Sequence, residues 1–226
     1  MSDKNHSWRI GAPLPLIRPH SLAKHRVIEQ YLLRYVKTLT SNPRMDKLRL
    51  TLVDGFAGGG MYRDELMKDD RFGSPLLMLK AMRDAEDVAV EGRTKEFRLD
   101  VEYFFIEKDR DAFEHLKATL NSSAYQSVVA EKATLLNDTF TNQVERIVRH
   151  VKEQSDKKRV IFVLDQFGWI NAPMPQLRHI LSELENAEII LTFATDTLID
   201  YLSTNETTQK SLEKVGLPIG SEKILT

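Results

Sequence analysis

The chain of 226 residues contains no cysteine. Disulfide frameworks, thiolate metal sites and cysteine nucleophiles are therefore excluded together. Long apolar runs are also missing, because none approaches the roughly 20 residues that span a bilayer. Residues 1–10 carry charges but no apolar region typical of a signal peptide. We therefore expect a cytoplasmic protein with no membrane contact.

The chain also lacks an excess of charge of either sign. Its 32 Lys and Arg residues face 33 Asp and Glu residues, which leaves a formal net charge of −1. No overall field recruits nucleic acid, so a basic site would have to be local. The most basic segment begins at Arg18, includes Lys24 and Arg26, and ends at Lys37. It is either the solvated face of a helix or a surface that contacts nucleic-acid phosphate.

Two further patterns are absent. The six histidines show no metal-ligand spacing, and no serine lies in a G-x-S-x-G nucleophile elbow. We expect no metal centre.

The hydrophobic pattern alternates between strand-like and helix-like segments. We predict strands over residues 48–53, 101–106, 128–135, 160–164 and 188–193, and helices over 22–41 (capped by Ser21), 74–84 (capped by Ser74), 110–120, 142–154 and 173–184. Such alternation indicates an α/β fold with a mostly parallel sheet and helices on both faces. We expect one domain overall, in which residues 1–42 form an N-terminal extension and helix, and residues 43–226 form the Rossmann-like part.

A glycine-rich loop follows the first predicted strand. It consists of Asp54, Gly55, Phe56, Ala57, Gly58, Gly59 and Gly60. In open α/β sheets ligands bind at the carboxyl ends of the strands, and glycine lets the backbone approach a ligand closely. We interpret the loop as a cofactor site, with a plain flexible loop as the alternative. In the dinucleotide-binding fingerprint a helix begins directly after the glycines, whereas here the polar stretch 61–72 follows them.

Two acids follow the next two strands. Glu107 ends the strand 101–106, where a carboxylate can accept hydrogen bonds from both hydroxyls of a ribose; a surface acid is the alternative. Asp138 follows the third strand and could pair with an adenine amino group. An Asx turn or a helix cap explains Asp138 equally well.

The fourth strand ends in an acid, an amide, two aromatic rings and a glycine: Asp165, Gln166, Phe167, Gly168 and Trp169. A carboxylate or amide here can hold an amino group, and an aromatic plane can stack on a base. We therefore place the reacting centre here. A turn with an aromatic plug over the sheet is the alternative.

In combination, these motifs resemble the three-Cys-motif partner (TcmP) family of bacteria. The resemblance covers residues 20–202 and rests on Lys24, Tyr31-Leu32, the loop 54–60, Gly73-Ser74-Pro75, Phe105-Ile106-Glu107 and the segment 164–168. That family is similar to class I methyltransferases, which implies a Rossmann-like methyltransferase fold and S-adenosyl-L-methionine as cofactor. By this resemblance Glu107 lies at the ribose of the cofactor and Asp138 at its adenine. The methionine part would be lined by Asp54, Gly55, Gly58 and Gly60. Residues 165–168 would hold the target amine.

Two departures from methyltransferases leave the activity open. Gln166 stands where amino-methyltransferases have proline, and we predict no further strands in residues 198–226. Either the sheet is short on that side, or the chain is a fragment of a longer protein. Our first hypothesis is a methyltransferase acting on an amino group of a nucleic-acid base, with Phe167 or Trp169 stacked on the base and Lys24 and Arg26 near phosphate. The second is a catalytically degenerate binding protein, the partner of a protein encoded nearby, for example in phage defence. The third hypothesis is an enzyme that catalyses hydrolysis or group transfer on a different nucleotide.

Overall fold

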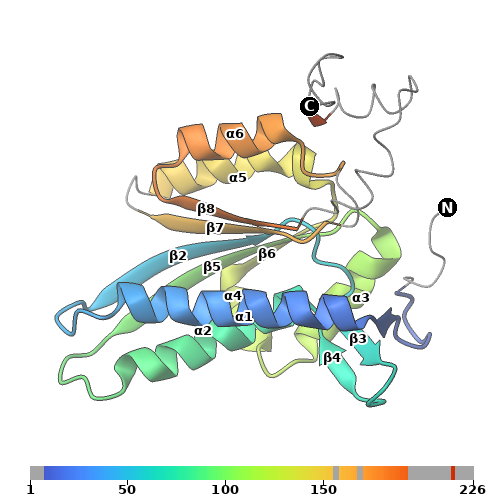
Figure 1. The fold of residues 1–226 in the computed structure, drawn as a ribbon, viewed down its shortest axis with the longest axis horizontal. Coiled ribbons are helices and arrows are strands. Elements are labelled where there is room, and N and C mark those ends of the chain that lie inside the picture. Colours follow the sequence, from blue (N-terminus) through green and yellow to red (C-terminus); the bar gives the residue numbers. More distant parts are fainter. Residues whose placement is uncertain (1–7, 155–157, 167–169, 193–214, 217–226) are drawn as a thin grey trace, which may run out of the picture.

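The computed structural model describes residues 8–154, 158–166, 170–192, 215 and 216. Its main sheet has five strands in the order β6-β5-β2-β7-β8, and all of them are parallel (Figure 1). The strands are β2 (Lys47–Asp54), β5 (Arg98–Ile106), β6 (Ala133–Leu136), β7 (Arg159–Leu164) and β8 (Ala187–Leu191). Helices lie on both faces of this sheet, so the predicted α/β, Rossmann-like fold class is confirmed. The strand order reverses between β2 and β7, which is where ligands bind in such sheets.

Each face of the sheet has its own core. On one face lie α1 (Pro19–Leu39), α2 (Ser74–Val90), α3 (Arg110–Asn121) and α4 (Gln126–Lys132), and on the other α5 (Phe140–Gln154) and α6 (Met174–Glu183) (Figure 1). Because successive side chains of a strand point to opposite faces, Leu52 packs with α1 and α2 whereas Val53 packs with α5 and α6. Val160–Leu164 is fully buried, as its continuous apolar sequence predicts for a central strand.

The first two long helices begin differently from the prediction. Helix α1 starts at Pro19 with Arg18 as N-cap, so Ser21 lies inside its first turn and is not the cap. Proline at the first helical position has a preset φ and needs no hydrogen-bond partner for its nitrogen. Helix α2 likewise has Gly73, not Ser74, as N-cap, and it continues to Val90.

The segments before and after the glycine loop form a second, small sheet. Strand β1 (Leu16–Ile17) pairs in parallel with β3 (Met61–Asp64), and β3 pairs antiparallel with β4 (Asp70–Phe72). The sequence predicted only an N-terminal extension before the first helix and a polar stretch over 61–72. The carboxylate of Asp64 closes the turn between β3 and β4 by accepting from Leu66 N and Met67 N.

The third predicted strand is wrong over most of its length. Residues 126–132 form the short helix α4, and only residues 133–136 enter the sheet as β6. The two valines that suggested a strand behave differently, because Val129 is buried while Val128 is 39% exposed. One buried side chain per turn suffices to dock a short helix, so packing outweighs the β propensity of valine here.

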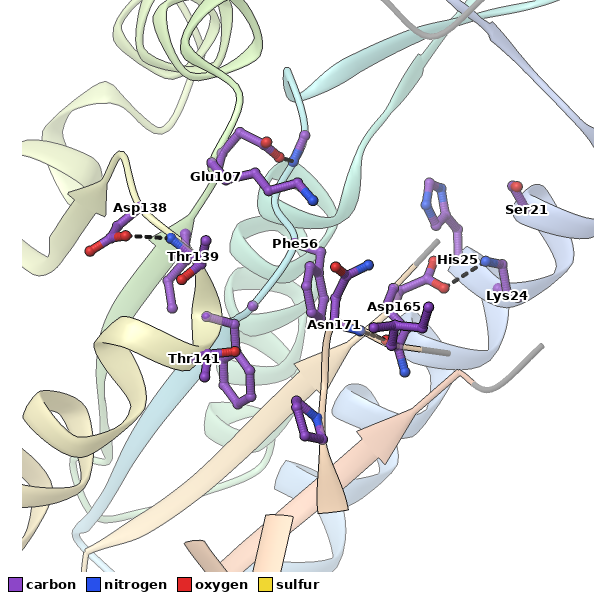
Figure 2. Close-up of a pocket in the computed structure, with 18 of the residues that line it drawn as sticks. Ser21, Lys24, His25, Phe56, Glu107, Asp138, Thr139, Thr141, Asp165 and Asn171 are labelled. Carbon is purple, nitrogen blue, oxygen red and sulfur yellow. Dashed lines mark hydrogen bonds and ion pairs between the residues drawn. The ribbon is translucent and has the colours of Figure 1, made fainter. Parts of the chain in front are cut away.

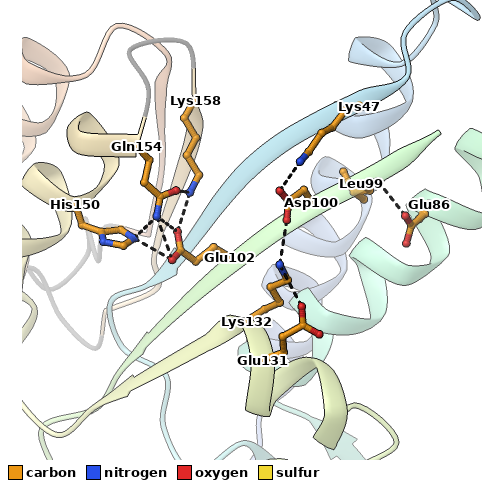
Figure 3. Close-up of polar contacts among 10 residues, drawn as sticks. All are labelled: Lys47, Glu86, Leu99, Asp100, Glu102, Glu131, Lys132, His150, Gln154 and Lys158. Atoms are coloured by element: carbon orange, nitrogen blue, oxygen red, sulfur yellow. Dashed lines mark hydrogen bonds and ion pairs between the residues drawn. The ribbon is translucent and has the colours of Figure 1, made fainter. Parts of the chain in front are cut away.

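Ion pairs connect the amino-terminal part of β5 to its neighbours (Figure 3). Lys158 Nζ, in a buried side chain just before β7, lies 2.7 Å from Glu102 Oε2, and His150 Nε2 of α5 lies 2.9 Å from Glu102 Oε1. Asp100 pairs with Lys47 and Lys132 at 2.9 and 3.3 Å. These contacts tie β5, which lies between β6 and β2 in the sheet, to β2, to α4 and α5 and to the segment before β7.

The last predicted strand ends at Leu191, two residues earlier than expected. Apart from residues 215 and 216, the segment 198–226, in which we expect no further strands, lies outside the described residues. Within the part of the chain that the structure describes, no helix combines the length and apolar character needed to cross a membrane.

Candidate ligand-binding site

A cleft of ≈ 680 Å³ opens at the carboxyl ends of β2, β5 and β7 (Figure 2). This volume is in the range of small-molecule sites. Its walls come from the glycine loop, the end of β5, the first turn of α5, the segment after β7 and the first turns of α1. The predicted convergence of loop, acids and β7 end at one sheet edge is therefore present.

The glycine loop lines the cleft only in part. Gly55, Phe56 and Gly58 face it, whereas Asp54, Ala57 and Gly60 do not. A Cβ on Gly59 would lie 2.2 Å from the Trp8 ring, and one on Gly60, whose φ is +85°, would lie 3.0 Å from a side-chain carbon of α3. At these two positions the space that glycine leaves is filled by the protein itself, which the sequence did not indicate.

Asp54 supports the loop from beneath. Its side chain is fully buried, and Oδ1 accepts a hydrogen bond from Phe56 N at 3.1 Å. Burial raises the pKa of this carboxyl to about 7, although hydrogen bonds from the Ser74 hydroxyl and Phe56 N lower it. The nearby charges of Asp165 and Glu107 raise the pKa further.

Glu107 lies beside the loop, as predicted. Its Oε2 accepts from Gly58 N at 2.8 Å, and its Oε1 accepts from Asp109 N at 2.8 Å. Burial raises the pKa of Glu107 in spite of these two bonds. A carboxylate has about four acceptor positions, so both oxygens can accept further hydrogen bonds from a ligand in the cleft.

Asp138 lines the cleft but is engaged by the start of α5. It accepts from Thr139 N, Asn142 Nδ2 and Gln143 Nε2 at 2.7 to 2.8 Å. The bonds from Gln143, Asn142 and Thr139 lower its pKa. Asp138 is not the cap of α5, because the backbone N–H of Asn142 donates to the Thr139 hydroxyl at 3.3 Å; its contact with adenine stays a prediction.

The segment after β7 brings two of its predicted residues to the cleft. Asp165 Oδ1 lies 2.6 Å from Lys24 Nζ of α1, with side chains 14% and 31% exposed respectively. Gln166 is buried, and its Oε1 accepts from Asn171 N and Ala172 N at 2.9 and 3.0 Å. The amide at the position where proline was expected therefore shapes the loop by hydrogen bonds. Phe167, Gly168 and Trp169 lie outside the described residues.

The two basic residues predicted to contact phosphate separate in the structure. Lys24 lies in the cleft, paired with Asp165, whereas Arg26 is exposed and does not line the cleft. Ser21, Lys24 and His25 follow the spacing i, i+3, i+4 and therefore share one face of α1 (Figure 2). That spacing was present in the sequence and could have indicated a cleft-facing stripe.

Sequence reasoning missed His25 and Trp8. His25 is 8% exposed, and its Nδ1 has no hydrogen-bond partner among the residues that the structure describes. Burial lowers the His25 pKa, with the charge of Lys24 acting in the same direction and that of Asp165 opposing it. Trp8 covers Gly58 and Gly59 and donates from Nε1 to Met61 O at 2.7 Å.

Two of the acids lie apart from the basic side chains of the cleft, whereas Asp165 lies beside Lys24. In Figure 2, Glu107 and Asp138 lie on one side of Phe56, and Lys24 and His25 lie on the other. Arg18, the N-cap of α1, and His20 in its first turn also line the cleft. Over the described ranges, no group of three His, Asp or Glu side chains could hold a metal ion.

Comparison with known proteins gives no family for the chain. No family model matches it, and no curated protein matches it. Among solved structures it is similar to protein LPL1258 from Legionella pneumophila str. Philadelphia 1, described with the family model DUF519. The two are 10% identical, with a TM-score of 0.44 over 81% of this chain and 70% of that chain. The likeness carries no argument about function.

Proposed function

We propose that the protein binds S-adenosyl-L-methionine in this cleft and transfers its methyl group to an amino group of a nucleic-acid base. The hydrogen bond between Glu107 Oε2 and Gly58 N carries the proposal. It joins the end of β5 to the loop after β2 and holds a carboxylate in the cleft, where it can accept from the two hydroxyls of a ribose.

The charges next to the loop fit this cofactor. The charges of Asp165 and Glu107 lie close enough to Asp54 to raise the pKa of its carboxyl. Such a cluster attracts the cationic sulfonium and ammonium groups of S-adenosylmethionine and repels the pyrophosphate of a dinucleotide. Glu107 itself can accept from the ribose of either cofactor, so the preference for the sulfonium cofactor rests on the combined negative charge near the loop.

The chain's own residues would bind and orient the reactants. The cofactor supplies an electrophilic methyl group. Asp165 would accept a hydrogen bond from the acceptor amine and fix its direction, and Phe56 separates the two sides of the cleft. Orientation of this kind accelerates transfer without covalent catalysis.

A second candidate is a binding protein that retains the cleft and performs no transfer. The observation in its favour is the Lys24–Asp165 ion pair, which occupies the carboxylate that an acceptor amine needs. Such a protein would act as the partner of another protein.

Methyl transfer to RNA and DNA separates the two candidates. The protein is incubated with methyl-labelled S-adenosylmethionine and total RNA or DNA, and incorporated label is measured. We expect label in nucleic acid, a loss of about 100-fold in Asp165→Asn, and no change in Glu131→Gln, an exposed acid remote from the cleft. Binding of S-adenosylhomocysteine without any transfer by the wild type would instead establish the binding protein.

A further inference from the structure

The Lys24–Asp165 pair links α1 to the end of β7 across 141 residues of sequence. Both side chains line the cleft, and the 2.6 Å distance makes this a direct, charge-assisted hydrogen bond (Figure 2). The carboxylate that the proposed function assigns to the acceptor amine therefore already holds an amine of the protein.

An acceptor that offered only an amine would bind poorly here. It would replace Lys24 on Asp165 and leave the Lys24 ammonium, which is 31% exposed, without its acid. Separating a partly buried pair is unfavourable because one charge loses its partner. Binding becomes favourable when the acceptor also gives Lys24 a new anionic partner.

The surroundings of Lys24 favour an anion. Arg18 and His20 line the same wall of the cleft. The first turn of α1 holds no acidic residue. The amino end of a helix adds a positive partial charge, which reinforces the Lys24 ammonium.

We propose that Lys24 determines acceptor specificity by exchanging partners. In the free protein it holds Asp165; when a nucleotide binds, the amine of the base takes Asp165 and the Lys24 ammonium moves to the nucleotide phosphate. The substrate class is thus an amine-bearing base that carries a phosphate. The inference rests on the proposed function for the role of Asp165.

The test compares cytidine 5′-monophosphate with cytidine as probes. Dissociation constants are measured by calorimetry for the wild type, Lys24→Met, Lys24→Arg and Arg26→Met, each with and without saturating S-adenosylhomocysteine. Arg26→Met removes one charge from the same helix outside the cleft and serves as the matched control.

We expect the wild type to bind the monophosphate at least about tenfold more tightly than cytidine, a preference that weakens with salt. Lys24→Met should abolish the preference while binding cytidine more tightly, because Asp165 is then free. Lys24→Arg and Arg26→Met should retain it. If Lys24 had a purely structural role, Lys24→Met would weaken the binding of both probes by the same factor.

The proposal is overturned if the wild type does not distinguish the probes or binds neither, or if Lys24→Met keeps the preference. Asp165→Asn gives a second test should Lys24→Met fold poorly: it should keep the phosphate preference and lose affinity for cytidine. If the preference for the monophosphate depends on Lys24 but S-adenosylhomocysteine does not bind, the proposed cofactor is wrong. The exchange of Lys24 between Asp165 and the phosphate is then still supported.

Discussion

Asp54 is fully buried at the end of β2, between the sheet and the glycine loop. Burial, which outweighs the hydrogen bonds from Ser74 and Phe56 N, holds its pKa at about 7 instead of the ordinary 3.8. In the unfolded chain the carboxyl loses its proton near the ordinary value. Between these two pH values the folded protein therefore binds one more proton than the unfolded chain.

This extra proton makes a prediction about stability. The free energy of unfolding should fall as pH rises from about 4 to about 7, and Asp54→Asn should remove that contribution because an amide does not titrate. Between pH 5.5 and 8 the wild type should lose about 2 kcal/mol relative to the variant, since one pKa unit corresponds to about 1.4 kcal/mol. Urea unfolding at both pH values measures the difference. Parallel pH curves for the two proteins would show that Asp54 is ionised in the folded state.

At the residue scale, the sequence predicted which acids meet. Asp54, Glu107 and Asp165 each follow a predicted parallel strand, and parallel strands present their carboxyl ends at one edge. The roles of their neighbours were not predictable. Gln166 bonds to backbone groups five and six residues away, and such contacts depend on the path of the loop.

The segment around Trp8 packs directly on the glycine loop. The Trp8 ring contacts the Tyr62 ring edge-on, with 5.2 Å between the two ring centroids. The Trp8 Nε1 donates to Met61 O. A Cβ on Gly59 would collide with this ring at 2.2 Å. The loop and the N-terminal segment are therefore coupled elements.

A double-mutant cycle tests this coupling. Gly59→Ala should destabilise the protein by about 1–3 kcal/mol, the usual range for overpacking, because the new methyl group displaces Trp8. In a Trp8→Ala background the same change should cost much less. Urea unfolding of the four proteins gives the coupling energy. Additive effects would mean that Trp8 does not cover Gly59 in solution.

At the element scale, the sequence predicted well wherever a pattern was long and periodic. The central strands and α3, α5 and α6 lie within a few residues of their expected positions. The short elements were missed for a physical reason. Strands β1, β3 and β4 span two to four residues, too few for a period to emerge, and they exist because they pair with one another.

Across the whole molecule, alternation of strands and helices was sufficient to predict the parallel sheet and the edge that carries the cleft. It did not predict that α1 closes the cleft opposite β5. That arrangement depends on α1 packing beside α2 through Ile28, Leu32 and Val36, which places Lys24 on Asp165. Contacts between segments so distant in sequence follow from the assembled fold and from no local pattern.

The central claim is that this cleft binds S-adenosylmethionine with Glu107 at the ribose. Calorimetric titration with S-adenosylmethionine and S-adenosylhomocysteine tests it most directly, on the wild type, Glu107→Ala and the control Glu131→Gln. We predict micromolar binding, about −8 kcal/mol, that is lost in Glu107→Ala and unchanged in Glu131→Gln. A folded wild-type protein that binds neither compound, or equal binding by Glu107→Ala, would contradict the claim.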